Sequence, residues 1–79
     1  MKGFARITFD PQVMGGRACI RGMRITAALV LNLLADGMTS EEIFDAYPYL
    51  EPADIQEVLR YASWLAEEQI LPIESQPAA

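Results

Sequence analysis

The stretch that decides the fold is TAALVLNLLADGMTSEEIFDAYPYLEP, residues 26–52. Its first part, residues 27–35, is apolar on nearly every side of a helix, which is typical of a central helix buried by its neighbours. Thr26 precedes this part as an N-cap, and Gly37 follows it as a C-terminal stop. The stretch therefore predicts one buried helix with both ends marked in the sequence.

Two further helices are expected after it. Thr39 and Glu42 have the spacing of a capping box, and Pro48 ends the helix that they begin. Pro52 suits the first position of a third helix, which runs to about Gln69. Three helices with a short turn between the last two match the outline of a helix-turn-helix domain, of the homeodomain-like or winged-helix-like kind.

The N-terminal region, residues 1–25, is expected to form a basic β arm. Residues 4–9 combine β-branched and aromatic side chains, as strands do. Residues 18–20 and 23–25 add two shorter strand pieces, with a break at Gly22. Because a lone hairpin is only marginally stable in water, we expect the arm to pair with another chain or to pack on the helices.

The chain therefore predicts one small, mainly α domain in three parts. The expected parts are a short N-terminal β hairpin arm (1–25), a three-helix helix-turn-helix-like domain (26–71) and a flexible tail (72–79). With 79 residues the chain is too short for two domains, yet 52% of it is hydrophobic. A core of this size cannot hide so much apolar surface, so we expect a homodimer or association with another protein.

Composition excludes many kinds of enzyme. The chain has no His, and its one Cys, Cys19, cannot form an intramolecular disulfide or a thiolate cage for a metal; we expect it in the core. We therefore expect a cytoplasmic protein that is not an enzyme and has no catalytic residues, cofactor or metal site. No stretch reaches the roughly 20 apolar residues that span a membrane, and the N-terminus lacks the apolar run of a secretory signal.

Basic side chains are concentrated in the arm, which carries a net charge of +4 against −9 for the rest of the chain. Arg17, Arg21 and Arg24 are the candidates to bind an anion. If this part is extended, Arg17 and Arg21 share one face with Cys19. A guanidinium binds phosphate and carboxylate equally well, so nucleic acid and an acidic protein partner both stay open, with a solvated hairpin as the alternative.

The third helix offers little to a DNA groove. Its first turns carry the carboxylates of Glu51, Asp54 and Glu57, which repel phosphates. Only Gln56 and Arg60 suit contact with a base edge or a backbone oxygen. Glu51 and Asp54 also have a structural explanation, because their charges complement the positive end of the helix.

The far end of the third helix is the candidate protein-partner interface. Helical phase places one apolar stripe toward the core, made of Val58, Leu59, Ala62, Leu65 and Ala66. Tyr61 and Trp64 point away from that stripe and would offer a partner two aromatic rings. The interface is expected to continue into Ile70, Leu71 and Ile73. Alternatively, the N-terminal strands cover the aromatic residues, from the same subunit or from a second one.

Two motifs make the chain resemble a known family. ITFDP (7–11) and MGGRACIRGMRI (14–25) match the signature I-x-x-[DN]-P followed by G-G-[KR]-[PA]-x-[IV]-x-G-[TM]-R-[IV]. This signature is that of the bacterial domain of unknown function 433 family, and the likeness extends over about residues 7–66, through LLADG (33–37). Ala18 stands where Pro is common in the family, which implies a looser turn there.

The resemblance implies a helix-turn-helix-like fold and a role similar to that of VapB-type antitoxins, which are encoded beside a PIN-like ribonuclease. It carries over no catalytic residue; the recurring arginines of the family match Arg17 and Arg24. We therefore expect an antitoxin-like protein of a type II toxin-antitoxin pair that binds and inhibits a PIN-like ribonuclease, with operator DNA as a further expected target. The alternatives are a stand-alone DNA-binding transcription regulator and a structural protein-interaction module.

Overall fold

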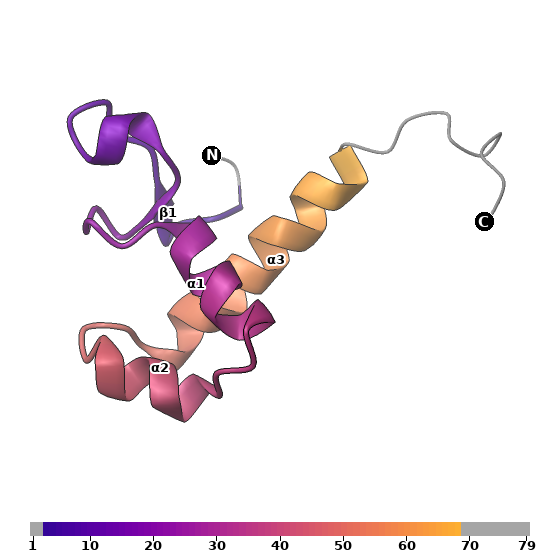
Figure 1. The fold of residues 1–79 in the computed structure, drawn as a ribbon. Coiled ribbons are helices and arrows are strands. Elements are labelled where there is room, and N and C mark those ends of the chain that lie inside the picture. The colour runs from indigo at the N-terminus through magenta and orange to yellow at the C-terminus, as the bar shows by residue number, and fades with distance from the viewer. Residues whose placement is uncertain (1–2, 69–79) are drawn as a thin grey trace, which may run out of the picture.

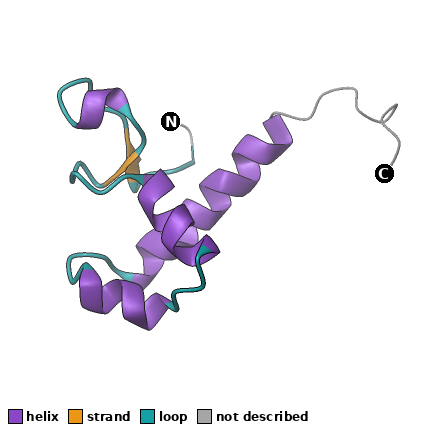
Figure 2. Cartoon of the chain, in the orientation of Figure 1, coloured by secondary structure: helices purple, strands orange, loops and turns teal. Residues whose placement is uncertain are grey.

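A computed structural model describes residues 3–68 as a short β hairpin followed by three helices (Figures 1 and 2). The elements in order are β1 (Ile7–Thr8), the 3-10 turn η1 (Met14–Gly16), β2 (Cys19–Ile20), α1 (Ala27–Ala35), α2 (Ser40–Ala46) and α3 (Pro52–Glu68). The expected mainly α fold with a short N-terminal hairpin is confirmed. Within the described residues, no helix is long and apolar enough to cross a membrane.

Helix α1 begins and ends where the sequence predicts. The hydroxyl of Thr26 accepts a hydrogen bond from the N–H of Leu29 at 3.0 Å, as an N-cap does. At the other end Gly37 has φ of +95°, and its N–H donates to the carbonyl of Leu34 at 3.0 Å. That backbone conformation is strained for a residue with a Cβ, which is why glycine ends the helix.

The capping box of α2 is also confirmed. Thr39 Oγ1 accepts from the N–H of Glu42 at 3.1 Å, and Glu42 Oε1 accepts from the N–H of Thr39 at 2.8 Å. The helix stops before Pro48, and α3 starts at Pro52 as expected. A short connection thus turns the chain from α2 into α3, which runs behind α1 and extends well past it (Figure 1).

The hairpin is shorter than the sequence predicts. In the antiparallel ladder Ile7 lies opposite Ile20, and each strand has only two residues where residues 4–9 were expected to be extended. Arg21 and Gly22 follow with φ of +46° and +75°, so the chain reverses directly after β2. Residues 23–25 form no strand, so the prediction of one there was wrong. Pairing continues only as an Ile20 N–H that donates to the Ile25 carbonyl at 2.9 Å and an isolated antiparallel bridge between Cys19 and Thr26.

The core lies where the hairpin meets the inner faces of the three helices. Its buried apolar residues are Ile7, Ile20, Ala27, Val30, Ile43, Leu50, Ile55, Val58 and Tyr61. Cys19 is buried beside them, as predicted. Half-buried hydrophobic side chains such as Leu65 and Phe44 pack against this core.

The inward face of α3 differs from the expected stripe. Tyr61 is only 8% exposed, whereas Leu59 is 46% exposed and Ala66 is also exposed. The predictions of an off-core Tyr61 and a core Leu59 were therefore wrong. The reason is that the N-terminal segment covers the Tyr61 side of the helix, so the buried face is centred near Val58 and not on the Leu59 side.

Candidate functional site

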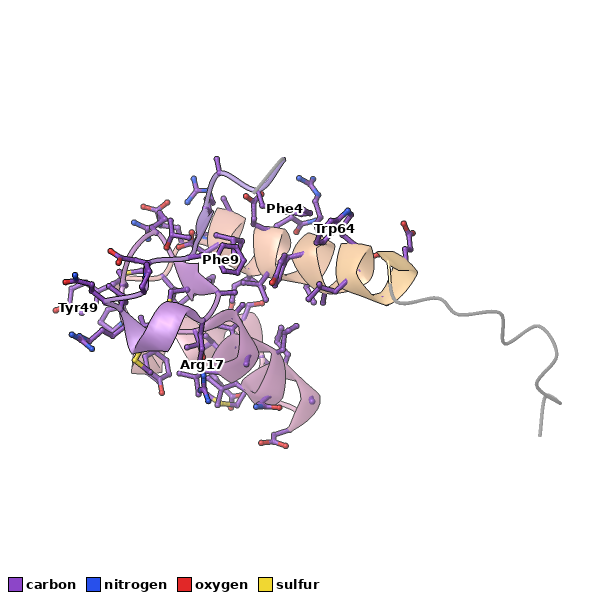
Figure 3. The ribbon with its side chains drawn as sticks, turned by 90° about the horizontal axis from the view of Figure 1, so that it is seen from above. Phe4, Phe9, Arg17, Tyr49 and Trp64 are labelled. Carbon is purple, nitrogen blue, oxygen red and sulfur yellow. The ribbon has the colours of Figure 1, made fainter. Side chains whose placement is uncertain are left out.

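Four aromatic side chains gather along the second half of α3. Phe4 contacts Tyr61 edge to face with ring centroids 5.6 Å apart, and it also lies 5.7 Å from Trp64. Phe9 meets Tyr61 at 6.3 Å, and Tyr61 stacks on Trp64 at 6.3 Å. Figure 3 shows Phe4 close to Trp64, with Phe9 further back along the helix. These separations are in the range of favourable aromatic pairs.

The N-terminal segment thus folds across the aromatic side of α3 within one chain, which confirms one of the two alternatives. Coverage is incomplete: Trp64 remains 37% exposed and Phe9 44% exposed, while Tyr61 lies beneath them. Exposed rings that are held by neighbouring rings lose little side-chain entropy on contact with another protein. The cluster therefore combines one buried ring, Tyr61, with two partly exposed rings, Trp64 and Phe9.

An apolar hollow of about 440 Å³ continues this cluster. It lies between α1 and α3, and the residues that line it are Arg17, Ala18, Thr26, Ala27, Ala28, Leu31, Tyr61 and Leu65. Arg17 is the one charged residue of this lining, is exposed, and forms no salt bridge with any residue of the 3–68 range. We call the aromatic cluster and this hollow together the aromatic face.

A second group of functional interest lies at the opposite end of α3, around Asp54. The carboxylate is completely buried and accepts four hydrogen bonds. Arg21 donates from Nε at 3.1 Å and from Nη2 at 2.9 Å, Arg6 Nη1 donates at 2.9 Å, and the backbone N–H of Glu51 donates at 2.8 Å. All the acceptor positions of the carboxylate are therefore occupied.

Burial alone would raise the pKa of Asp54, because desolvation disfavours a charge. The hydrogen bonds from Arg21, the Glu51 N–H and Arg6 outweigh it, so the pKa lies below its ordinary value. The pKa of Arg21 is raised by its hydrogen bonds to Asp54, and that of Arg6 by those to Glu51 and Asp54. The three side chains thus remain charged and tie the hairpin to the start of α3.

These contacts change the interpretation of the three candidate arginines. Arg21 leaves the strand with positive φ and is held by Asp54, so it does not share an open face with Arg17 as predicted, and Cys19 between them is buried. Arg17 lines the hollow beside α1, whereas Arg24 lines a different hollow. The structure therefore does not join the three arginines into one basic patch.

The outer side of α3 is as acidic as the sequence indicates. Gln56 and Arg60 are exposed, so both are accessible for contact. They stand among Glu51, which binds Arg6, and Glu57, whose Oε2 accepts the backbone N–H of Arg6 at 2.9 Å. The remaining members of the expected partner interface, Ile70, Leu71 and Ile73, lie outside the described residues.

The sequence analysis did not predict the ion pair between Arg6 and Asp54, although the sequence contains one sign of it. At 100° per residue, Asp54 lies about 40° from Val58, within the phase of the buried face. A carboxylate at a core position needs a cationic partner, which indicates one of the arginines of the arm. Which arginines it binds depends on the fold of the hairpin and could not be inferred from spacing.

The geometry defines a small helical domain with an open aromatic face and, among its described residues, no cluster of side chains that could hold a metal ion. The chain belongs to the family described as protein of unknown function (DUF433), whose match covers residues 7–62. The family resemblance noted from the two motifs is thereby confirmed. No curated protein and no solved structure matches the chain.

Proposed function

We propose that this protein is a homodimeric, non-enzymatic inhibitor of the antitoxin kind, which binds and restrains a PIN-like ribonuclease. The observation that carries the proposal is the aromatic face, where a 37% exposed Trp64 and a 44% exposed Phe9 adjoin an apolar hollow. Trp, Tyr and Arg are the residues that contribute most to protein-protein binding, and all three types occur here.

Arg17 gives this face a means of inhibition. A PIN-like nuclease would hold its metal ion with carboxylates, and a guanidinium suits a carboxylate in a bidentate arrangement. Arg17 lies beside the hollow, exposed and without a salt bridge among the described residues. An apolar partner side chain in the hollow would therefore bring Arg17 close to the surface of the nuclease.

Protein binding ranks above DNA binding because of two features. Arg21 is held by the buried Asp54, which removes one of three expected phosphate contacts. The start of α3 presents Glu51 and Glu57, whose charges oppose a phosphate backbone. A stand-alone transcription regulator is thus the weaker alternative, and operator binding with the nuclease stays a further expectation.

The test is a complex with the product of the neighbouring reading frame. The two proteins are expressed together, and RNA cleavage by the partner is measured as this protein is added. We expect a stable complex and loss of cleavage, with the inhibition constant raised at least about thirtyfold by Arg17→Ala. Arg60→Ala, an exposed arginine of α3 outside the hollow, is the matched control. Cleavage that continues unchanged at saturating protein contradicts the proposal.

A further inference from the structure

A second hollow, of about 420 Å³, lies apart from the aromatic face. One wall is the turn that follows β2, the other is the connection from α2 to α3, and the lining consists of Met23, Arg24, Ile25, Tyr47 and Tyr49. We call these five residues the Tyr49 patch. Figure 3 shows Tyr49 at one end of the molecule and Trp64 well away from it on α3. The contacts proposed for a nuclease do not use this patch.

Tyr49 is 73% exposed, more than any other large hydrophobic side chain among the described residues. Its backbone is nevertheless fixed. Its carbonyl accepts a hydrogen bond from Arg21 Nη2 at 2.8 Å, and the next residue, Leu50, is buried with its N–H bonded to the carbonyl of Tyr47 at 3.0 Å. A protruding ring on a fixed turn is suited to insertion into a partner.

The patch therefore contains a projecting ring that also forms part of the wall of an apolar hollow. In a two-fold symmetric dimer the same surface of both subunits forms the interface, so the projecting ring of each subunit can contact the hollow of the other. We infer that a second copy of this chain docks on the Tyr49 patch, with each Tyr49 ring seated in the hollow of the other copy. The inference names the contact surface of the homodimer and so rests on that part of the proposed function.

Charge favours a second copy as the occupant. Arg24 is on one wall of the hollow, and the opposite wall continues into α2, where Asp45 is exposed two residues before Tyr47. A two-fold axis that runs along the hollow, between its walls, would bring Arg24 of each copy opposite the end of α2 in the other, where Asp45 is exposed. Neither Arg24 nor Asp45 has a salt-bridge partner within residues 3–68. A nucleic acid on the patch would meet the same α2 carboxylates unfavourably.

The mass of the whole protein in solution, measured by sedimentation over a concentration series, tests the inference. Wild type should reach twice 8.8 kDa. Tyr49→Ser should raise the dimer dissociation constant at least about thirtyfold, because each subunit loses its central contact. Leu59→Ser, which removes a 46% exposed leucine elsewhere, should leave it unchanged. Circular dichroism of both variants should match that of wild type, because both positions are exposed.

A charge exchange tests the orientation. Arg24→Glu and Asp45→Arg should each weaken the dimer, and the two changes together should restore it. A wild type that stays monomeric, a Tyr49→Ser dimer of wild-type strength, or a double variant without recovery would overturn the inference. So would a monomer that binds a labelled single-stranded oligonucleotide through Tyr49.

Nuclease binding is measured in parallel. The monomeric Tyr49→Ser variant should retain it, since the aromatic face is intact. Failure of partner binding with an intact dimer counts against nuclease inhibition alone. A Tyr49→Ser dimer of wild-type strength with intact inhibition counts against this surface alone, and a wild type that stays monomeric also counts against the homodimer of the proposed function.

Discussion

The two ends of α3 are built in opposite ways. At its start a carboxylate with no exposed surface, that of Asp54, has every acceptor position filled by Arg6, Arg21 and the backbone of Glu51. In its second half a buried ring, that of Tyr61, is flanked by rings that remain more than one-third exposed. At the start of α3 the polar groups of Asp54 are all hydrogen-bonded within the chain, whereas the second half of the helix leaves aromatic surface exposed.

The difference separates a part of the molecule that fixes the fold from a part whose side chains are accessible for contact. Directional hydrogen bonds and ion pairs at the start of α3 attach the hairpin at a defined position. Phe4 and Phe9 then extend from that hairpin over Tyr61, so the polar end positions part of the aromatic face. Substitutions at each end test whether the two ends have these separate roles.

The largest effect on folding is expected at Tyr61. Tyr61→Ala should lower the free energy of unfolding by about 3–5 kcal/mol, because it leaves a cavity under Phe4 and Phe9. Trp64→Ala should lower it by only about 1 kcal/mol, since the indole is partly exposed. Urea unfolding of both variants checks this. Equal losses would show that the two rings are equally part of the core.

Asp54→Asn should lower the free energy of unfolding by about 3 kcal/mol. This value is at the low end for a broken buried ion pair, because the Arg6 and Arg21 side chains are 33% and 34% exposed and can turn to water. Chemical denaturation gives the value, with the exposed Asp45→Asn as control. A loss no greater than that of the control would mean that the buried carboxylate does not hold the hairpin.

Acid should weaken the same end of the helix. The pKa of Asp54 is lower in the folded protein than its ordinary value of about 3.9, so the unfolded state binds its proton first as the pH falls. The stabilisation from Asp54 is thus fully present above the ordinary pKa and is lost as the pH drops through the folded pKa. Unfolding free energies measured from neutral pH to about pH 3 should fall more steeply for wild type than for Asp54→Asn. Parallel curves would contradict the lowered pKa.

The smallest effects concern DNA, should the protein bind it. Replacing Arg17 and Arg24 by Ala should reduce the salt dependence of binding by about two phosphate contacts per chain. Arg21→Ala should change this slope little, because its guanidinium is bound to Asp54. Gln56→Ala should alter sequence preference only slightly. Filter binding across a salt series checks all of these, and a loss of sequence discrimination in Gln56→Ala would assign base contact to α3.

The parts of this structure that local chemistry determines could be predicted from the sequence. The N-cap at Thr26, the stop at Gly37 and the Thr39–Glu42 capping box depend on neighbouring residues alone, and all were found as predicted. Helix ends of this kind are marked because the unpaired backbone groups there need specific partners nearby.

The candidate site depends on contacts between distant parts of the chain and was predicted only in part. Trp64 was correctly expected at the surface, but Tyr61 is buried because Phe4, 57 residues earlier, covers it. Arg21 was expected to face an external anion, and it binds Asp54 instead. Helical phase and charge could indicate an arginine partner for Asp54, but they could not show which arginine binds it or that Phe4 covers Tyr61.

We propose above all that the aromatic face binds a protein partner. The test is a calorimetric titration of wild type and Trp64→Ala against the product of the neighbouring reading frame, with thermal melting of each free protein. An aromatic anchor that becomes buried in an interface contributes about 2–4 kcal/mol to binding, so we expect an affinity roughly thirtyfold to a thousandfold weaker. The melting temperature should fall by no more than about 4–8 °C, as a loss of about 1 kcal/mol in folding free energy implies. Unchanged affinity together with a melting temperature lowered by more than about 10 °C would place Trp64 in the core and contradict the claim.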